Sequence, residues 1–322
     1  MAHEITARKN GFIEFAFAGP REAIWHKLGQ QMQEGASIDQ WKVDAGMDWQ
    51  INSSPLIYQF GEEQRVEENV QILHRSDDGK RLGIVSDSYK IVQPGEVLEF
   101  FRDLTELHGM KLSAAGTLFG GSKFWATADV GKSNFVVDGD RVDGYLLLMS
   151  SADGTSSTVA KFCATRAVCN NTIQIALTER SKNAIKITHA RDFDAKAVKI
   201  DMGLIDQAWD GFIENIKKMA TKSVDDKAAQ DFFAKLITPE DKAVDMELLR
   251  TQRHVDAMMH FYKSGAGADM TYGTQWGVLN AVTELATHGQ GKRDASKQFV
   301  DSEIGGMANM KMEAYKRLVA MI

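Results

Sequence analysis

The stretch KLSAAGTLFGGSKFWATADV, Lys111–Val130, indicates the fold class of this chain. Its two halves have the composition of strands, and Gly120-Gly121 between them is typical of a turn. Two more strands are predicted in VDGYLLLMSSA and SSTVAKFCATRAVC, with Asp153-Gly154 marking the turn between them. Residues 111 to about 177 are therefore expected to form successive antiparallel strands.

The preceding residues predict a hairpin and a helix. VQILHR and RLGIVSDSY flank SDDGK, whose Asp-Gly pair suits the positive φ of a tight turn. QPGEVLEFFRDLTELHG has apolar residues at helical spacing, Pro94 in its first turn and Gly109 at its end. Residues 1–66 have a mixed pattern, with a short helix expected after Ser37 and an extended segment in WQINSSPLIYQF.

From about residue 195 onward the apolar residues recur with the helical period of 3.6. We therefore predict an α+β fold, in which an antiparallel β-sheet with an intercalated helix is followed by a helical C-terminal region. The expected divisions are an N-terminal mixed segment (1–66), an α+β core domain (67–193) and the helical region (194–322).

The composition limits the class of protein. The chain has 322 residues, of which 43% are hydrophobic and 25% are charged, as is ordinary for globular proteins. It contains no apolar run long enough for a membrane span, and its first residues do not resemble a secretory signal. Two cysteines in a chain of this length favour a reducing compartment, so we expect a cytoplasmic protein.

Charge is unevenly distributed along the chain. The formal net charge is -6, and from Met1 to Val70 the 11 acidic residues outnumber the 6 Lys and Arg residues. From Ser156 to Asp192 the balance reverses, with only Glu179 and Asp192 opposing six basic residues, which are Lys161, Arg166, Arg180, Lys182, Lys186 and Arg191. A basic stripe on an acidic protein is typical of a phosphate-binding surface, although an ordinary basic face would look the same.

The stretch AKFCATRAVCNNTIQIA, Ala160–Ala176, places polar residues inside an apolar segment. A metal or redox site is one explanation, but Cys163 and Cys169 are six positions apart, which on a strand separates them by roughly 20 Å at about 3.3 Å per residue. Packing explains these cysteines better. A catalytic site is the second explanation, but the sequence has no nucleophile elbow, HExxH motif or Walker loop. We therefore expect no enzyme activity, cofactor or metal.

The third explanation is a surface that binds a polyanion. The six basic residues would contact phosphates, and Asn170, Asn171 and Thr172 would hydrogen-bond phosphate or sugar. Three residues of the preceding segments would add to this surface, namely Tyr89, Lys90 and Trp125. The two aromatic rings would stack on bases, and core packing is the alternative explanation for them.

Four stretches carry a resemblance to a known family. WHKLG, SDSYKIVQPGEVLEFF, ATRAVCNNTIQIA and GTQWGVLNAVTELATHG together resemble the phage/plasmid-like proteins of the domain-of-unknown-function 932 family (DUF932), over residues 20 to 320. This resemblance implies a phage- or plasmid-borne protein and no particular activity. More distantly, the order of elements resembles the β-β-β-α core of Rad52-type annealing proteins, which implies rings or filaments that hold single-stranded DNA without ATP or metal.

Two functions follow as expectations. The first is a phage recombination-type protein of the bacterial host cytoplasm that binds and anneals single-stranded DNA. It would act as a homo-oligomer, with a phage or host recombination protein as a further partner. The alternative is a protein-interaction factor, such as an antagonist of a host nuclease or a replication scaffold, whose acidic N-terminal part would mimic nucleic acid or dock on a basic partner.

Overall fold

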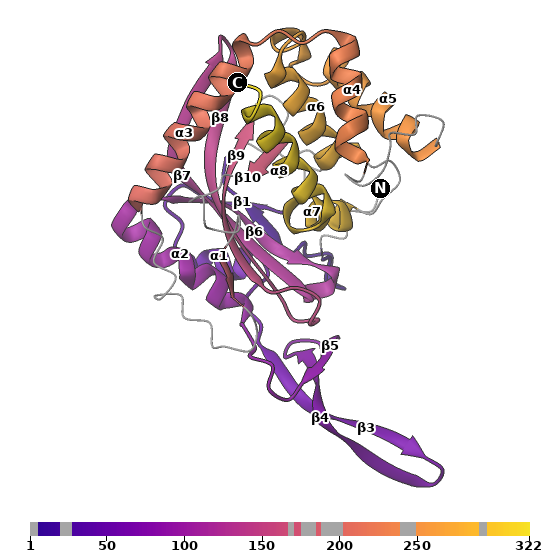
Figure 1. Ribbon diagram of the computed structural model, residues 1–322. Coiled ribbons are helices and arrows are strands. Elements are labelled where there is room, and N and C mark those ends of the chain that lie inside the picture. The colour runs from indigo at the N-terminus through magenta and orange to yellow at the C-terminus, as the bar shows by residue number, and fades with distance from the viewer. Residues whose placement is uncertain are drawn as a thin grey trace. The chain divides into compact units, whose positions relative to one another are not determined.

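The computed structural model describes residues 6–19, 28–166, 171–174, 185–187, 202–238, 249–289 and 295–322 (Figure 1). The chain divides into two compact units. Unit 1 consists of Met1–Gly131, Leu146–Lys161 and Ala184–Ile200, and unit 2 consists of Lys132–Tyr145, Phe162–Asn183 and Asp201–Ile322. The units thus take alternating stretches of the chain, whereas the sequence suggested three consecutive segments.

Most strands belong to one large sheet. These strands are β1 (Phe15–Phe17), β2 (Gln30–Gln31), β6 (Lys111–Leu118), β7 (Lys123–Val137), β8 (Asp140–Ser151), β9 (Thr158–Arg166), β10 (Asn171–Gln174) and β11 (Ile185–Ile187). Among the described residues their order is β10-β9-β8-β7-β6-β1-β2, and β11 also pairs with β9. β6 pairs antiparallel with β1 and β7, as β9 does with β10 and β11, whereas β1 and β2 are parallel.

The pattern of buried residues along a strand shows whether one or both of its faces are covered. In β7 the buried residues Phe124, Ala126 and Ala128 alternate with partly exposed ones, as expected for a strand with one covered face. In β9 every side chain from Thr158 to Ala164 is buried, whether apolar or polar. A central strand that is covered on both faces loses the alternation, so the polar residues of β9 are also enclosed.

A second sheet has three strands in the order β3-β4-β5. They are β3 (Ile51–Phe60), β4 (Glu63–Arg75) and β5 (Arg81–Ser86), and both pairings are antiparallel. The hairpin predicted around SDDGK is therefore confirmed. However, β4 begins at Glu63, so the division proposed at residue 66 falls inside a strand.

Two helices of unit 1 begin where the sequence predicted, and the second also ends where predicted. α1 (Ile38–Asp44) begins after Ser37, whose side chain accepts a hydrogen bond from the Gln40 amide. α2 (Pro94–His108) ends at Gly109, which has a left-handed φ of 66°. The two helices pack against each other, α1 also contacts β1, and α2 contacts β6.

Helices dominate unit 2. They are α3 (Met202–Thr221), α4 (Asp226–Ile237), α5 (Leu249–Ser264), α6 (Gln275–His288), α7 (Ala295–Ile304) and α8 (Gly306–Val319). α6 is buried from Gln275 to Ala286 and contacts α5, α8 and β10, so it forms the centre of this unit. The α+β class with a helical C-terminal region is confirmed. Among the described residues no helix is both long and apolar enough to cross a membrane.

Candidate functional site

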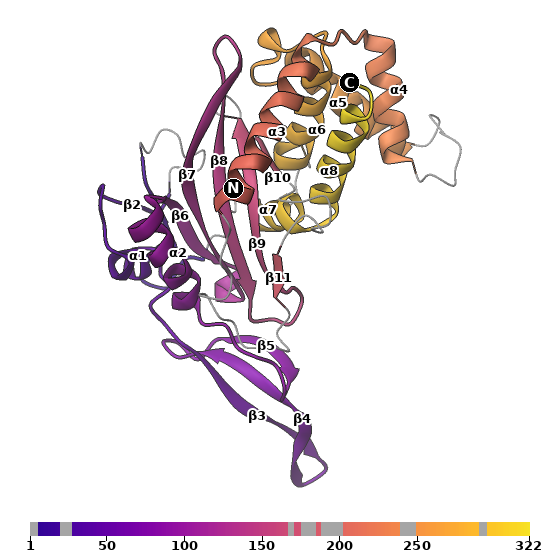
Figure 2. The ribbon, with the colours of Figure 1, turned by 60° about the vertical axis from the view of Figure 1, so that its left-hand side comes forward.

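Strands β3 and β4 continue beyond β5 as a two-stranded ribbon (Figures 1 and 2), which we name the arm and define as residues 55–69. β5 pairs with β4 only from Val70 onward. At the start of the arm the register shifts between Pro55 and Leu56, where β4 contributes extra residues. Asn69 lies in this bulge with a φ of 63°, a left-handed conformation that Asn tolerates. Because bulges bend a strand, the arm turns at the point where its support by β5 ends.

The arm exposes large apolar side chains on both faces. The exposed fractions are 55% for Ile57, 42% for Tyr58, 60% for Phe60 and 60% for Val66. Ile57 and Val66 are cross-strand partners on one face, and Tyr58 and Phe60 alternate onto the other. An isolated two-stranded hairpin is at best marginally stable in water, so a partner that covered these side chains would stabilise the arm.

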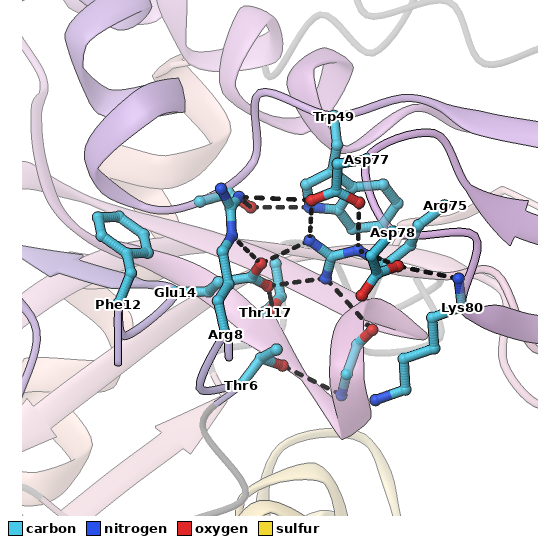
Figure 3. A network of polar contacts seen from close by, with 12 residues as sticks. Thr6, Arg8, Phe12, Glu14, Trp49, Arg75, Asp77, Asp78, Lys80 and Thr117 are labelled. Carbon is cyan, nitrogen blue, oxygen red and sulfur yellow. Dashed lines mark hydrogen bonds and ion pairs between the residues drawn. The ribbon is translucent and has the colours of Figure 1, made fainter. Parts of the chain in front are cut away.

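The three-stranded sheet from which the arm extends is held by one buried ion pair (Figure 3). Arg75 is the last residue of β4, and Glu14 lies immediately before β1. Arg75 Nη1 donates to Glu14 Oε2 at 3.0 Å, and Arg75 Nη2 donates to Glu14 Oε1 at 2.6 Å. The two side chains are 2% and 0% exposed. This bidentate pair ties the three-stranded sheet to the N-terminal segment with fixed geometry.

Further groups complete the hydrogen bonding of the pair. Arg8 Nε donates to Glu14 Oε1 at 2.7 Å, and the Thr117 hydroxyl donates to Glu14 Oε2. Arg75 also donates to Asp77, from Nε at 2.9 Å and from Nη2 at 2.7 Å, and its Cζ lies 4.1 Å from the centroid of the Trp49 ring. We name these residues the anchor: Arg8, Glu14, Trp49, Arg75, Asp77 and Thr117.

Two glycines allow the anchor to pack. A Cβ at Gly46 would lie 2.5 Å from Glu14 Cγ, and a Cβ at Gly121 would lie 2.7 Å from the Trp49 ring and 2.9 Å from Arg75 Nη1. Both residues also have positive φ, of 65° and 97°. The Gly120-Gly121 turn predicted from the sequence therefore has a second purpose, because only glycine leaves room for the buried guanidinium.

The charges of the anchor stabilise one another. Burial by itself would lower the pKa of Arg75, but its hydrogen bonds to Asp77 and Glu14 outweigh burial and raise that pKa. The hydrogen bond from Arg75 lowers the pKa of Asp77 despite partial burial. Since each oxygen of Glu14 already accepts two hydrogen bonds, its carboxylate is not available to a substrate. The arrangement suits a rigid support rather than acid–base chemistry.

A second buried network lies in unit 2. Arg166 Nε donates to Asp140 Oδ1 at 2.5 Å, and Trp276 Nε1 donates to Asp140 Oδ2 at 2.8 Å. Arg166 Nη1 and Nη2 donate to the carbonyl oxygens of Ala266 and Gly267, both at 2.9 Å. The ATRAVC and GTQWG stretches, which both carried the family resemblance, therefore meet at the carboxylate of Asp140.

The residues predicted to contact phosphate are not brought together at the surface. Lys161 and Arg166 are each only 2% exposed, because they lie in β9, which is covered on both faces. This placement corrects the expectation that they line a basic surface. Asn171 and Thr172 lie in β10 and Lys186 in β11, where only the backbone is described. Four predicted residues lie outside the described residues, namely Asn170, Arg180, Lys182 and Arg191.

The two aromatic residues predicted to stack on bases make contacts within the fold. The Tyr89 hydroxyl donates to the Ser151 carbonyl oxygen at 2.8 Å, and burial raises the pKa of Tyr89. The half-buried Trp125 ring lies 6.0 Å from that of Phe15, centroid to centroid, which supports the packing alternative. Lys90 is exposed. Cys163 is buried in β9, in accordance with the packing role expected for it.

The arm and its anchor were not identified from the sequence. One signal was present, because LIYQF and QRV, on either side of Gly61-Glu62-Glu63, have strand-forming residues around a turn. The four acidic residues of the arm lie beside these apolar residues, which is unusual for strands that face a core. Glu14 and Arg75 gave no signal, since no local pattern reveals a pair that is 61 positions apart.

Comparison with known proteins gives one match. A family model described as Domain of unknown function (DUF932) matches residues 81–304, which is more than half of the chain. The match contains the Asp140–Arg166–Trp276 network, but it begins after WHKLG, after the arm and after most of the anchor. No curated protein and no solved structure matches the chain.

Proposed function

Since this chain belongs to the family described as Domain of unknown function (DUF932), whose description names no activity, we propose a function from the structure itself. The protein is a protein-interaction factor that engages its partner through the arm. The observation that carries this proposal is the exposure of Ile57, Tyr58, Phe60 and Val66 on a ribbon that extends from the sheet held by the buried Arg75–Glu14 pair.

Physical reasons favour a protein as the partner. Contiguous exposed apolar groups in a water-soluble chain mark interaction sites, whereas scattered ones need no explanation. Tyr and Phe are enriched in protein interfaces because they contribute a large contact area with few rotatable bonds. Because the anchor holds the sheet from which the arm extends, only the arm itself would have to become ordered on binding. Antagonism of a host nuclease and scaffolding of replication proteins are both compatible with this mode.

Single-stranded DNA binding and annealing is the second candidate. It is supported by the sequence between Arg180 and Arg191, which has four basic residues and no acidic residue. Lys161 and Arg166 give it no support, because both are buried. This candidate function includes the expectations of a Rad52-type core and of assembly into a ring or filament. Its test is fluorescence anisotropy with a labelled oligonucleotide at two salt concentrations, where phosphate contacts require affinity to fall steeply with salt.

The arm proposal is tested by capture from nuclease-treated lysate of a bacterial host. The tagged full-length protein is compared with Tyr58→Ser/Phe60→Ser, and with Phe135→Ser as a matched control. Phe135 is 57% exposed, but it lies in β7 outside the arm. Complexes that are lost only in the arm variant support the proposal. Complexes that survive in the arm variant, or that disappear on nuclease treatment of the wild type, contradict it.

A further inference from the structure

The charges around the apolar residues of the arm narrow the class of partner. The arm has Glu62, Glu63, Glu67 and Glu68 against a single Arg65, which gives it a formal charge of -3 within 15 residues. All of these side chains are exposed. Glu63 and Glu67 are the cross-strand partners of Phe60 and Leu56, so their negative charge lies on the same face as Tyr58 and Phe60.

Arg65 does not neutralise this field. Its Nη2 lies 3.0 Å from Glu63 Oε2, and its Cζ lies 4.4 Å from the centroid of the Phe60 ring. The single positive charge is thus already engaged with one glutamate and one aromatic ring. Glu62, Glu67 and Glu68 have no ion-pair partner among the residues that the structure describes.

From this arrangement we infer that the arm docks on a protein surface that is apolar at its centre and basic at its rim. This inference rests on the function proposed above. Tyr58 and Phe60 would enter the apolar part, and the glutamates on the arm would face Lys and Arg side chains of the partner. Interfaces of this type have an apolar core and a polar rim, and complementary charge selects the partner and accelerates association.

The same charges disfavour other occupants. Phosphates of a nucleic acid and an anionic lipid surface would both meet carboxylates of like sign. Two arms from separate copies of this chain would also place -3 against -3, which opposes arm-to-arm pairing. On a basic partner surface, both the burial of apolar side chains and the attraction between charges favour binding.

The experiment selects a phage-displayed library of random peptides on the immobilised full-length protein, with counter-selection on Tyr58→Ser/Phe60→Ser. The enriched peptides are expected to combine apolar residues with net positive charge. A synthetic copy of one is then titrated against a variant with all four arm glutamates changed to Gln, with Glu34→Gln as the control for an exposed carboxylate outside the arm. We expect about a tenfold loss of affinity in the fourfold variant, little change in the control, and weaker binding by the wild type in high salt.

Other outcomes overturn the inference and distinguish it from the proposed function. Enriched peptides that are neutral or acidic, or that bind the fourfold Gln variant as tightly as the wild type, contradict the basic partner while leaving the arm as a docking element. A failure to enrich any peptide that depends on Tyr58 and Phe60 contradicts both. Sedimentation that shows a dimer dissociated by Tyr58→Ser/Phe60→Ser identifies a second copy as the occupant, and also overturns the inference.

Discussion

Arg75 and Glu14, 61 positions apart in the chain, form a bidentate ion pair with side chains that are 2% and 0% exposed. Neither charge can regain water while unit 1 is folded, so both depend on hydrogen bonds within the anchor, where Asp77 also accepts from Arg75 and Arg8 also donates to Glu14. Arg75 is the last residue of β4, so the pair fixes that end of the strand in unit 1. The stability of the sheet from which the arm extends is therefore expected to depend on the anchor.

Replacement of Glu14 by Gln should destabilise unit 1. Removing one partner of a buried pair typically costs about 3–5 kcal/mol, and because Asp77 still pairs with Arg75 in this variant, we expect a loss toward the lower end of that range. Urea unfolding followed by circular dichroism measures the effect. The control is Glu34→Gln, because Glu34 is 89% exposed in its pair with Lys111, and such surface pairs contribute about 0–1 kcal/mol. Equal stability losses in the two variants would show that the anchor has no special role.

Replacement of Asp140 by Asn should destabilise unit 2 in the same way. The variant removes the carboxylate that pairs with the buried Arg166, and breaking such a buried pair typically costs about 3–5 kcal/mol. Asp138→Asn is the matched control, because Asp138 is exposed and only two positions away. Thermal unfolding of both variants, followed by the circular dichroism of the helices, measures the difference. An unchanged midpoint temperature for Asp140→Asn would refute a structural role for the pair of Asp140 and Arg166.

The contact between α1 and α2 should weaken in acid through Glu99. Hydrogen bonds from Arg102, at 2.6 and 3.0 Å, and from Lys42 lower the pKa of Glu99 to about 2. A carboxyl pKa below the unfolded value of about 4.3 stabilises the folded state above that pH, and this contribution is lost as the pH falls toward 2.

The Glu99→Gln variant should therefore lose less stability than the wild type between about pH 4.3 and pH 2. Because the Glu99 side chain is 37% exposed, the difference is expected to be modest and to shrink in high salt. Acid titrations of both proteins at two ionic strengths measure it. The same pH dependence in the variant and the wild type would exclude Glu99 as the titrating group.

Substitutions in the arm should leave the fold intact. Tyr58 and Phe60 are 42% and 60% exposed, and exposed substitutions away from special features usually change stability by less than about 0.5 kcal/mol. The Tyr58→Ser/Phe60→Ser variant is therefore expected to unfold at the same urea midpoint as the wild type. A clearly lower midpoint would mean that the arm packs against the rest of the protein, and loss of binding would then have a trivial cause.

Elements with local signals could be predicted from the sequence. Pro94 and Gly109 define the ends of α2, and the SDDGK turn defines the hairpin of β4 and β5. These signals depend on backbone preferences of a few neighbouring residues, which tertiary contacts did not override.

The candidate site could not be predicted in the same way. The exposed apolar residues of the arm satisfy the same alternation as a core strand, and alternation does not reveal whether anything covers the strand. Arginine is a residue type that commonly contacts phosphate, so nothing in the sequence indicated that Arg166 would be buried. Its burial depends on Asp140, 26 positions earlier, and on Trp276, which donates a hydrogen bond to the same carboxylate. Such long-range pairs have no local signature.

Hydrogen exchange of the arm amides, with and without an arm-selected peptide, tests the central claim most directly. A two-stranded ribbon alone is marginally stable, so the amides of residues 56–67 should exchange rapidly in the isolated protein. We predict that the peptide slows exchange in these residues while the amides of β6 and β7 are unchanged. Peptide-dependent protection that arises elsewhere, with the arm still exchanging rapidly, would contradict the account.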